Sequence, residues 1–399
     1  MEQIGGDSNL VIEYMEQLKN ENKLINLFCT LAEIPSPSLQ EEKVIEYICK
    51  YCEENNLNCE TDDYKNIYIK VPATDSEKSP ILLSAHMDVI GDDSEVKTYL
   101  DGDLIKAQGR TLGADDKAGV ANALYFAKEL SKRTDLKHGG LEIVFTRDEE
   151  SGMSGIKHTD FSRINSKYVL VLDSDALGQC LVSGASYVMV DLKINAPKGG
   201  HSGNDIADET RENAAKLIAD LIAEMPQGVY YSEDGKVVTS CNIGGICAGD
   251  VNVTNVINTD AHATYSIRSS QKDNENELIQ MMKEIVEDFN EEYTGIATAT
   301  IEFTEKMPMF EKNNDEYIPI LFETVAKKVG VEPEISSFHA GAETHIYANK
   351  TNAKGEKFSP YLLGLATVCN MHSAREYVDY KTMLKGQELL QAFFEAYNS

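Results

Sequence analysis

Short, continuous apolar runs recur through the first half of the chain. They read NIYIKV at 66–71, ILLSAHM at 81–87, LEIVFT at 141–146 and YVLVL at 168–172. Segments with helical periodicity lie between some of them. Continuous apolar strands separated by helices are typical of a mostly parallel sheet that is buried on both faces. The pattern therefore predicts an α/β domain in which helices flank the sheet.

The pattern changes at about residue 186. The run YVMVDLKINA at 187–196 alternates apolar and polar residues, as expected for a strand with one wet face. The elements predicted after it are a helix at 209–225, strands at 239–248 and 258–268, a helix at 275–293 and a strand at 297–304. This order, βαββαβ, is the ferredoxin-like plan.

From about Met307 the chain returns to helical and short apolar segments. These are a helix at 317–330, apolar runs around SSFHAG and PYLLGLATV, and a final helix at 380–397. We interpret them as the first domain resuming after an insertion. The predicted organisation is thus a first domain built from 1–185 and 305–399, with an inserted domain at 186–304.

A turn and a capping pattern precede the first strand. Ser38 is followed by Glu41 three residues on and then by Val44, Ile45 and Ile48 at helical spacing, which predicts a capped helix start. The chain has eight cysteines, and its only close pair, in the CKYC stretch of that helix, has no second pair to complete a zinc site. We expect reduced, packed thiols.

Charge narrows the class of partners. The 66 acidic residues against 37 basic ones give a net charge of −29, spread along the chain, which would repel nucleic acid and anionic membranes. No apolar stretch approaches the roughly 20 residues of a membrane span, and the start lacks the regions of a signal peptide. We therefore expect a cytoplasmic protein.

Polar side chains follow several of the predicted strands, where open parallel sheets bind their ligands. In the first strand of this kind, His86 and Asp88 share one face and Met87 points to the other. Such a pair suits a metal-ligating histidine oriented by a carboxylate. A packed histidine beside an ordinary surface aspartate is the alternative, and the pair alone favours it.

Further clusters add carboxylates and a second histidine. TLGADDKAG places Asp115 and Asp116 between small residues before a helix, where a helix cap is the alternative. In TRDEESG a strand is followed by three acidic residues. Neighbouring residues of a turn point in different directions, so one glutamate can bind a metal while the other faces a substrate water. LDSDALG supplies Asp173 and Asp175, and NMHSA supplies His372.

Each cluster alone is weak, but together they form a candidate metal site. The candidate ligands are His86, Asp115, Glu150, Asp173 and His372. They offer enough nitrogen and oxygen atoms for two divalent ions if one carboxylate bridges. The sequence contains no HExxH, GxSxG, GxGxxG or GxxxxGK[ST] motif. Nothing in it therefore supports a single-zinc protease, a serine hydrolase or a nucleotide-binding fold.

These motifs, in this order and with the inserted βαββαβ segment, resemble the dinuclear metallopeptidase family that includes peptidase T, carboxypeptidase G and aminoacylase, and most of all its peptidase T branch. HMDV, LGADDKAG and DEESG carry the resemblance, which covers nearly the whole chain. It implies that one metal is held by His86, Asp115 and Asp173, and the other by Asp115, Glu150 and His372. Asp115 would be the bridge, followed by a cis peptide bond.

The resemblance also implies roles for six other residues. Asp88 would orient His86, and Glu149 would be the general base. In the inserted domain, His201 of GGHSG would donate to the oxyanion, and Arg268 would bind the substrate's carboxylate, with a plain surface arginine as the alternative. The HAGAE stretch is more similar to aminoacyl-histidine dipeptidases and makes His339 and Glu343 candidates for contact with the substrate's amino end.

The sequence thus predicts a dimetal aminopeptidase that cleaves short peptides, with tripeptides as the leading substrate. Two alternatives are a dipeptidase of the aminoacyl-histidine type and an N-acyl-amino-acid amidohydrolase. A third alternative is a non-catalytic metal-binding protein of the same fold. Zinc is the expected metal, with manganese or cobalt as alternatives. The resemblance further implies a homodimer formed through the inserted domain, which would act as a lid.

Overall fold

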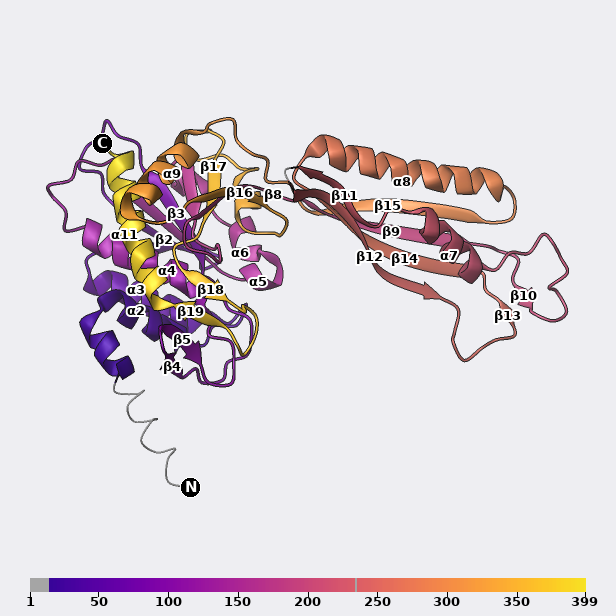
Figure 1. The fold of residues 1–399 in the computed structure, drawn as a ribbon, viewed down its shortest axis with the longest axis horizontal. Helices are drawn as coiled ribbons and strands as arrows, with labels where there is room; N and C mark the ends of the chain where they lie inside the picture. The colour runs from indigo at the N-terminus through magenta and orange to yellow at the C-terminus, as the bar shows by residue number, and fades with distance from the viewer. Residues whose placement is uncertain (1–13, 234) are drawn as a thin grey trace, which may run out of the picture. The chain divides into compact units, whose positions relative to one another are not determined.

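The computed structural model describes residues 14–233 and 235–399, which divide into two compact units (Figure 1). The first unit combines the described residues up to Val182 with Lys312–Ser336 and Ala342–Ser399. The second unit consists of Ser183–Glu311, residue 234 aside, together with Ser337–Gly341.

An eight-stranded sheet forms the centre of the first unit. Its strand order is β1 (Asn58–Thr61), β2 (Ile67–Val71), β6 (Leu141–Thr146), β3 (Ile81–His86), β7 (Tyr168–Val171), β17 (Ser359–Leu363), β8 (Gln179–Gly184) and β16 (Glu334–Phe338). The pairs β6–β3, β3–β7 and β7–β17 are parallel. Every residue of β3 and β6 is buried, as their continuous apolar runs predicted. The expectation of a mostly parallel central sheet between helices is confirmed.

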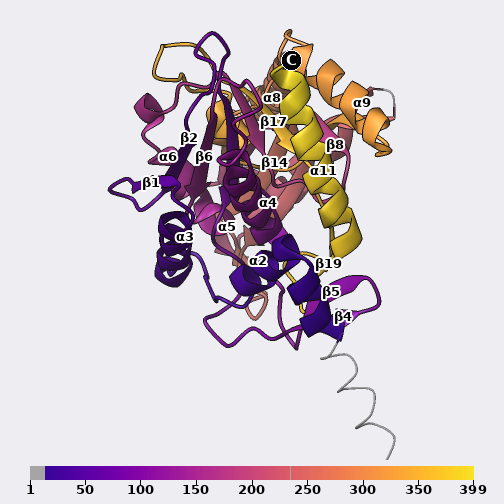
Figure 2. The same cartoon turned by 90° about the vertical axis from the view of Figure 1, so that its left-hand side faces the viewer.

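Helices pack around this sheet. In the described part of the first unit they are α2 (Lys23–Ala32), α3 (Glu42–Glu54), α4 (Ala114–Leu130), α5 (Glu149–Gly152), α6 (Ser154–Lys157), α9 (Tyr317–Val329), α10 (Thr344–Tyr347), α11 (Tyr380–Tyr397) and the 3-10 turn η1 (Phe161–Arg163). Helices α2, α4 and α11 pack on one another, and α4 also packs on β3 (Figure 2). None of the helices at 14–233 and 235–399 is long and apolar enough to cross a membrane.

A small antiparallel sheet completes the first unit. Its order is β18 (Thr367–Cys369), β19 (Tyr377–Asp379), β5 (Leu104–Ala107) and β4 (Thr98–Asp101). β18 and β19 form a hairpin, and the loop between them carries His372.

The second unit contains a five-stranded antiparallel sheet. Its order is β11 (Gly228–Glu233), β12 (Lys236–Ala248), β14 (Asp260–Ser269), β9 (Tyr187–Asn195) and β15 (Thr298–Met307). Two helices, α7 (Ala214–Glu224) and α8 (Lys272–Glu292), pack on each other and on this sheet (Figure 1), and β10 (Gly200–His201) pairs with β13 (Val256–Ile257). In β9, buried residues alternate with more exposed ones, since helices cover only one face of the sheet.

The predicted helix cap at Ser38 is wrong. Helix α3 begins at Glu42, and its N-cap, Glu41, makes no capping hydrogen bond with its side chain. The Ser38 hydroxyl instead donates to Asp88 at 2.7 Å. Glu41 is fully buried and binds the Arg147 side chain and the backbone N–H of Asp148. Partners distant in the sequence replace the local cap because they also satisfy a buried carboxylate. The eight cysteines are all free, as expected.

Candidate metal centre

The predicted ligands of the first unit come from five separate segments. His86 ends β3, Glu150 lies in α5 directly after β6, and Asp173 follows β7. Because β6, β3 and β7 are adjacent and parallel, their carboxyl ends lie at one edge of the sheet. The start of α4 brings Asp115 to this edge, and the β18–β19 loop brings His372.

Asp115 lies between the two histidines. Its Oδ1 is 3.1 Å from Nε2 of His86, and its Oδ2 is 3.1 Å from Nε2 of His372. His86 Nε2 is also 3.7 Å from Oδ1 of Asp173, and His372 Nε2 is 2.9 Å from Oε1 of Glu150. One carboxylate therefore presents a different oxygen to each of two ligand groups, as a bridging ligand does.

The electrostatics of this cluster fit bound cations. Burial raises the pKa of Glu150 to about 7, and burial together with the Asp115 carboxylate raises the pKa of Asp173 to about 7. Burial lowers the pKa of His86, yet hydrogen bonds to Asp115, Asp173 and Asp88 raise it well above its usual value. A crowded set of buried carboxylates is stable only when positive charge compensates it. The site favours positive charge, which divalent metal ions supply.

The environment of Glu150 gives a second indication that these residues suit bound metal ions. Its Oε1 is buried and accepts no well-aligned hydrogen bond from any described residue, although His372 Nε2 is close. A buried carboxylate oxygen without a donor is costly unless another ligand satisfies it. His86, Asp115 and Glu150 also present ligand atoms that all lie within 4.8 Å of one another. The donor set of imidazole nitrogens and carboxylate oxygens suits zinc and similar ions.

Asp88 is buried behind His86. His86 Nδ1 lies 3.0 Å from the carbonyl oxygen of Asp88 and 3.3 Å from its Oδ1. Because both atoms accept, the ring places its Nδ1–H toward Asp88, and Nε2 is the nitrogen that faces the cluster. Burial would raise the pKa of Asp88, but His86 and the hydrogen bonds from Glu149 N and Ser38 lower it to about 2.

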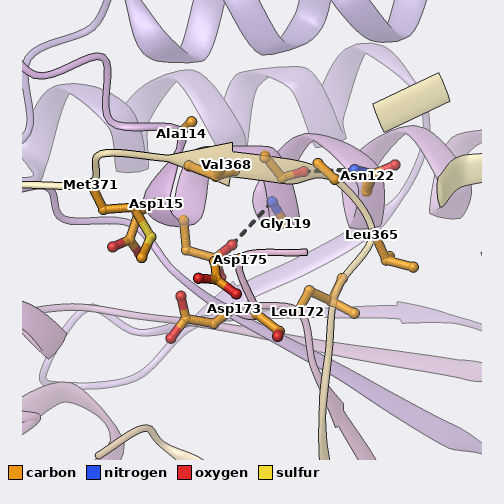
Figure 3. Close-up of a pocket in the computed structure, with 14 residues that line it drawn as sticks. Ala114, Asp115, Gly119, Asn122, Leu172, Asp173, Asp175, Leu365, Val368 and Met371 are labelled. Atoms are coloured by element: carbon orange, nitrogen blue, oxygen red, sulfur yellow. Dashed lines mark hydrogen bonds between the residues drawn. The ribbon is translucent and has the colours of Figure 1, made fainter. Parts of the chain in front are cut away.

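Glu149 stands beside these ligands at the start of α5. Burial raises its pKa well above the usual value; His86 opposes the shift, and the Asp173 and Glu343 carboxylates add to it. A carboxylate with a raised pKa is suited to accept and return a proton. Asp115, Asp173 and Asp175 line one cavity beside the start of α4 (Figure 3).

Sequence reasoning missed two acidic residues here. Asp116 is 2% exposed, and its carboxylate accepts the backbone N–H groups of Gly119 at 3.1 Å and His86 at 3.3 Å. Glu376 is 1% exposed and binds the backbone at the start of α4. Asp116 stood in a quoted motif, so its pairing with Asp115 was a usable signal, whereas nothing around Glu376 distinguishes it. The peptide bond between Asp115 and Asp116 is cis, as expected.

The substrate-binding candidates divide between the two units. Glu343 lies in the first unit, 1% exposed, and accepts a hydrogen bond from Ser84 at 3.3 Å. His201, Arg268 and His339 lie in the second unit. The exposed His201 accepts the N–H groups of Gly203 and Asn204 on its Nδ1, at 3.1 and 3.3 Å, so its proton is on Nε2.

Arg268 and His339 belong to one cluster within the second unit. Arg268 lies opposite Ser240 across the β12–β14 pair, its guanidinium is 4.8 Å from the Tyr187 ring centre, and the Ser240 hydroxyl is 2.7 Å from Nε2 of His339. Burial, and then Arg268, lowers the pKa of His339. Arg268 Nη1 and His339 Nδ1 are buried and have no hydrogen-bond partner among the described residues. Two such nitrogens suit an anionic group from outside the chain.

Comparisons with known proteins agree with this geometry. The model of "Peptidase family M20/M25/M40" matches residues 82–396. The uncharacterized protein YqjE of Bacillus subtilis is 26% identical over 392 residues, covering 94% of this chain and 98% of YqjE. Peptidase T of B. subtilis is 26% identical over 309 residues, covering 74% of this chain and 68% of that protein. The crystal structure of aminopeptidase PepT from Bacillus cereus is 25% identical and covers 94% of this chain and 98% of its own, with a TM-score of 0.83.

Proposed function

The chain belongs to peptidase family M20/M25/M40 and is a peptidase T-like metallopeptidase that hydrolyses short peptides, and we propose that it is an aminopeptidase which releases the N-terminal residue of tripeptides. The observation that carries metal-assisted hydrolysis is the position of Asp115, whose two oxygens face His86 and His372 separately. The likeness to aminopeptidase PepT supports release of the N-terminal residue, and the choice of tripeptides rests on the resemblance of the sequence motifs to the peptidase T branch.

Two divalent metal ions would be held by the five predicted ligands. His86, Asp115 and Asp173 would hold one ion, and His372, Asp115 and Glu150 the other, with Asp115 shared. When bound, the ions supply Lewis-acid polarisation of the scissile carbonyl and lower the pKa of the attacking water. We propose zinc for both positions, with manganese or cobalt as alternatives, because mixed imidazole and carboxylate ligands accept all three.

The chain's own residues would move the proton and hold the geometry. Glu149 would take the proton of the attacking water and deliver it to the departing amine, for which its raised pKa is suited. Asp88 would keep the imidazole of His86 in the required orientation. Glu343 stays a candidate for contact with the substrate's amino end, because its Oε1 is buried and has no hydrogen-bond partner among the described residues, and its charge also raises the pKa of Glu149.

The second unit would supply a donor to the oxyanion and bind the substrate's carboxylate. The Nε2–H of His201 is available as a donor to the oxyanion, because its Nδ1 is occupied as an acceptor. The unpartnered nitrogens of Arg268 and His339 would bind the substrate's carboxylate, which for His339 is the opposite end of the peptide from the amino end that the sequence suggested. A homodimer formed through this unit, its action as a lid, and a cytoplasmic location remain part of the proposal.

A substrate panel tests the assignment. Protein loaded with zinc, manganese or cobalt is given a free tripeptide, an aminoacyl-histidine dipeptide and an N-acetylated amino acid, and the products are identified. We expect the tripeptide to lose its N-terminal residue fastest. Preference for the dipeptide favours the dipeptidase, and cleavage of the acetylated compound alone favours the amidohydrolase. No cleavage with any metal favours the non-catalytic alternative.

A further inference from the structure

The first residues of α4, which include Asp115, have no side-chain acceptor at the N-cap, and within the helix Asp116 accepts an N–H further along, that of Gly119. Its N-cap residue is Gly113, at φ +74°, which has no side chain to offer. Asp115 and Asp116 have non-helical backbone angles inside this turn. The N–H groups at a helix start have no partner within the helix, and leaving them unpaired in the interior is costly. Another part of the chain must satisfy them.

Glu376 supplies the missing acceptor from a distant part of the sequence. Its Oε1 accepts the backbone N–H of Ala114 at 2.8 Å and that of Asp115 at 3.3 Å. Its Oε2 accepts the N–H of Gly113 at 2.9 Å and the hydroxyl of Thr111. One buried carboxylate therefore binds four donors of a single turn, and charge-assisted bonds of this kind are the strong ones. The helix start further favours its negative charge.

The position of Glu376 in the chain links the two ligand groups. It lies four residues after His372 in the loop between β18 and β19. The same loop thus carries one histidine ligand and the carboxylate that holds the turn of Asp115. The Oδ2 of Asp115 is 3.1 Å from Nε2 of His372. A shift of the turn relative to the loop would change this spacing directly.

We propose that Glu376 is a positioning residue that sets the spacing between Asp115 and His372 and thereby the affinity for the metal held by Asp115, Glu150 and His372. The inference rests on the proposed function, since it presupposes two metal positions. Glu376 contacts neither the substrate nor a metal in this role. It acts through the backbone of Gly113, Ala114 and Asp115.

The test compares Glu376→Gln with a matched control in the same hairpin. Asp379 also caps a helix, since its Oδ1 accepts the N–H groups of Lys381 at 2.9 Å and Thr382 at 3.2 Å at the start of α11. Asp379→Asn removes the same kind of charge without touching the α4 turn. Both variants and the wild type are stripped of metal and titrated with zinc alone in competition with a chelator, and their melting temperatures and kcat and KM values are measured.

We expect Glu376→Gln to weaken one of the two zinc-binding events by about 10- to 100-fold, the range typical of residues that orient ligands. Its kcat should fall while KM changes little. Asp379→Asn should lower the melting temperature and bind zinc as the wild type does. If Glu376→Gln does not fold, Thr111→Val removes a single donor to the same carboxylate and should weaken the same event by about 2- to 10-fold.

Two results overturn the inference. One is a Glu376→Gln or Thr111→Val protein that binds both zinc ions with wild-type affinity, and the other is an Asp379→Asn protein that loses as much affinity as Glu376→Gln. Both leave the proposed function intact if the wild type binds two ions and cleaves peptides. A wild-type chain that binds no divalent ion contradicts the proposed function itself.

Discussion

The carboxylate of Asp88 accepts the backbone N–H of Glu149 at 2.9 Å. The same carboxylate accepts the N–H of Glu150 at 3.1 Å and lies 3.3 Å from Nδ1 of His86. One buried side chain thus holds a predicted metal ligand and the first turn of α5, which carries the predicted base. The sequence suggested only the contact with His86.

This relationship predicts the effect of Asp88→Asn. In this variant an NH2 group takes the place of one carboxylate oxygen. That group donates and cannot accept, so either His86 or the α5 turn loses its acceptor. Metal affinity and kcat should each fall by about 10- to 100-fold. Zinc titration and steady-state kinetics measure both. Ser38→Ala removes a single donor to Asp88 and should have a smaller effect; equal effects would contradict the central role given to the carboxylate.

Replacing the proposed base should separate chemistry from metal binding. In Glu149→Gln the side chain keeps its shape but cannot accept a proton, so kcat should fall by at least about 100-fold. The metal content, measured by elemental analysis, should stay at the wild-type level because Glu149 is not among the proposed ligands. Glu53→Gln, on the exposed side of α3, serves as the control. A metal-loaded Glu149→Gln protein with wild-type turnover would contradict the assignment of Glu149 as the general base.

The cluster around Arg268 predicts how the substrate's carboxylate is bound. Arg268→Ala should raise KM for a free tripeptide by about 10-fold or more, the cost of a charged hydrogen bond, and leave zinc affinity unchanged. A tripeptide with a C-terminal amide should be a poorer substrate for the wild type. Arg268→Ala should no longer distinguish the amide from the free acid. If the variant still prefers the free acid by the wild-type factor, the carboxylate binds elsewhere.

Stability should depend on pH through His138, which lies away from the metal ligands. The ring is 1% exposed, its centre is 5.5 Å from that of Phe394, and its Nδ1 accepts the N–H of Gly140. Burial lowers the pKa of His138 below 6.5 in the folded chain. The unfolded chain therefore takes up a proton first as pH falls. The stability that neutral His138 contributes is complete above pH 6.5 and declines below it.

Urea unfolding of metal-free protein at several pH values measures this effect. Between pH 7.5 and 5.5 the wild type should lose more unfolding free energy than His138→Gln, which cannot titrate. His158→Gln, at an exposed position of the same unit, should behave as the wild type does. Identical pH profiles for the wild type and His138→Gln would contradict the prediction.

Alternation along strands was the most reliable guide to the site. At the end of β3 it predicted that His86 and Asp88 would share a face, and Nδ1 of His86 lies 3.3 Å from Oδ1 of Asp88. Strand ends in a parallel sheet likewise predicted that Glu150 and Asp173 would meet His86. The shared face could be predicted because the pleat depends on local sequence, whereas the meeting of the strand ends also required β6, β3 and β7 to lie side by side and parallel.

Contacts between distant segments were not predictable in the same way. Ser38 and Glu41 match a helix cap locally, yet they bind Asp88 and the segment before α5. Glu376 is one of 66 acidic residues, and only the approach of the β18–β19 loop to α4 distinguishes it. A carboxylate's partner is decided by which unpaired donors lie beside it after folding, and several donors can compete for it.

The sequence by itself determined the α/β plan, many of the strands and helices, and the side chains that the strand ends present, because each follows from periodicity over a few residues, whereas strands such as β4, β5 and β11 were not predicted. Only the tertiary structure decided which of those side chains meet, with Asp115 between His86 and His372, and which carboxylates hold them. The burial of charge decides which side chains meet, because a buried carboxylate is tolerated only where folding brings compensating donors and cations beside it.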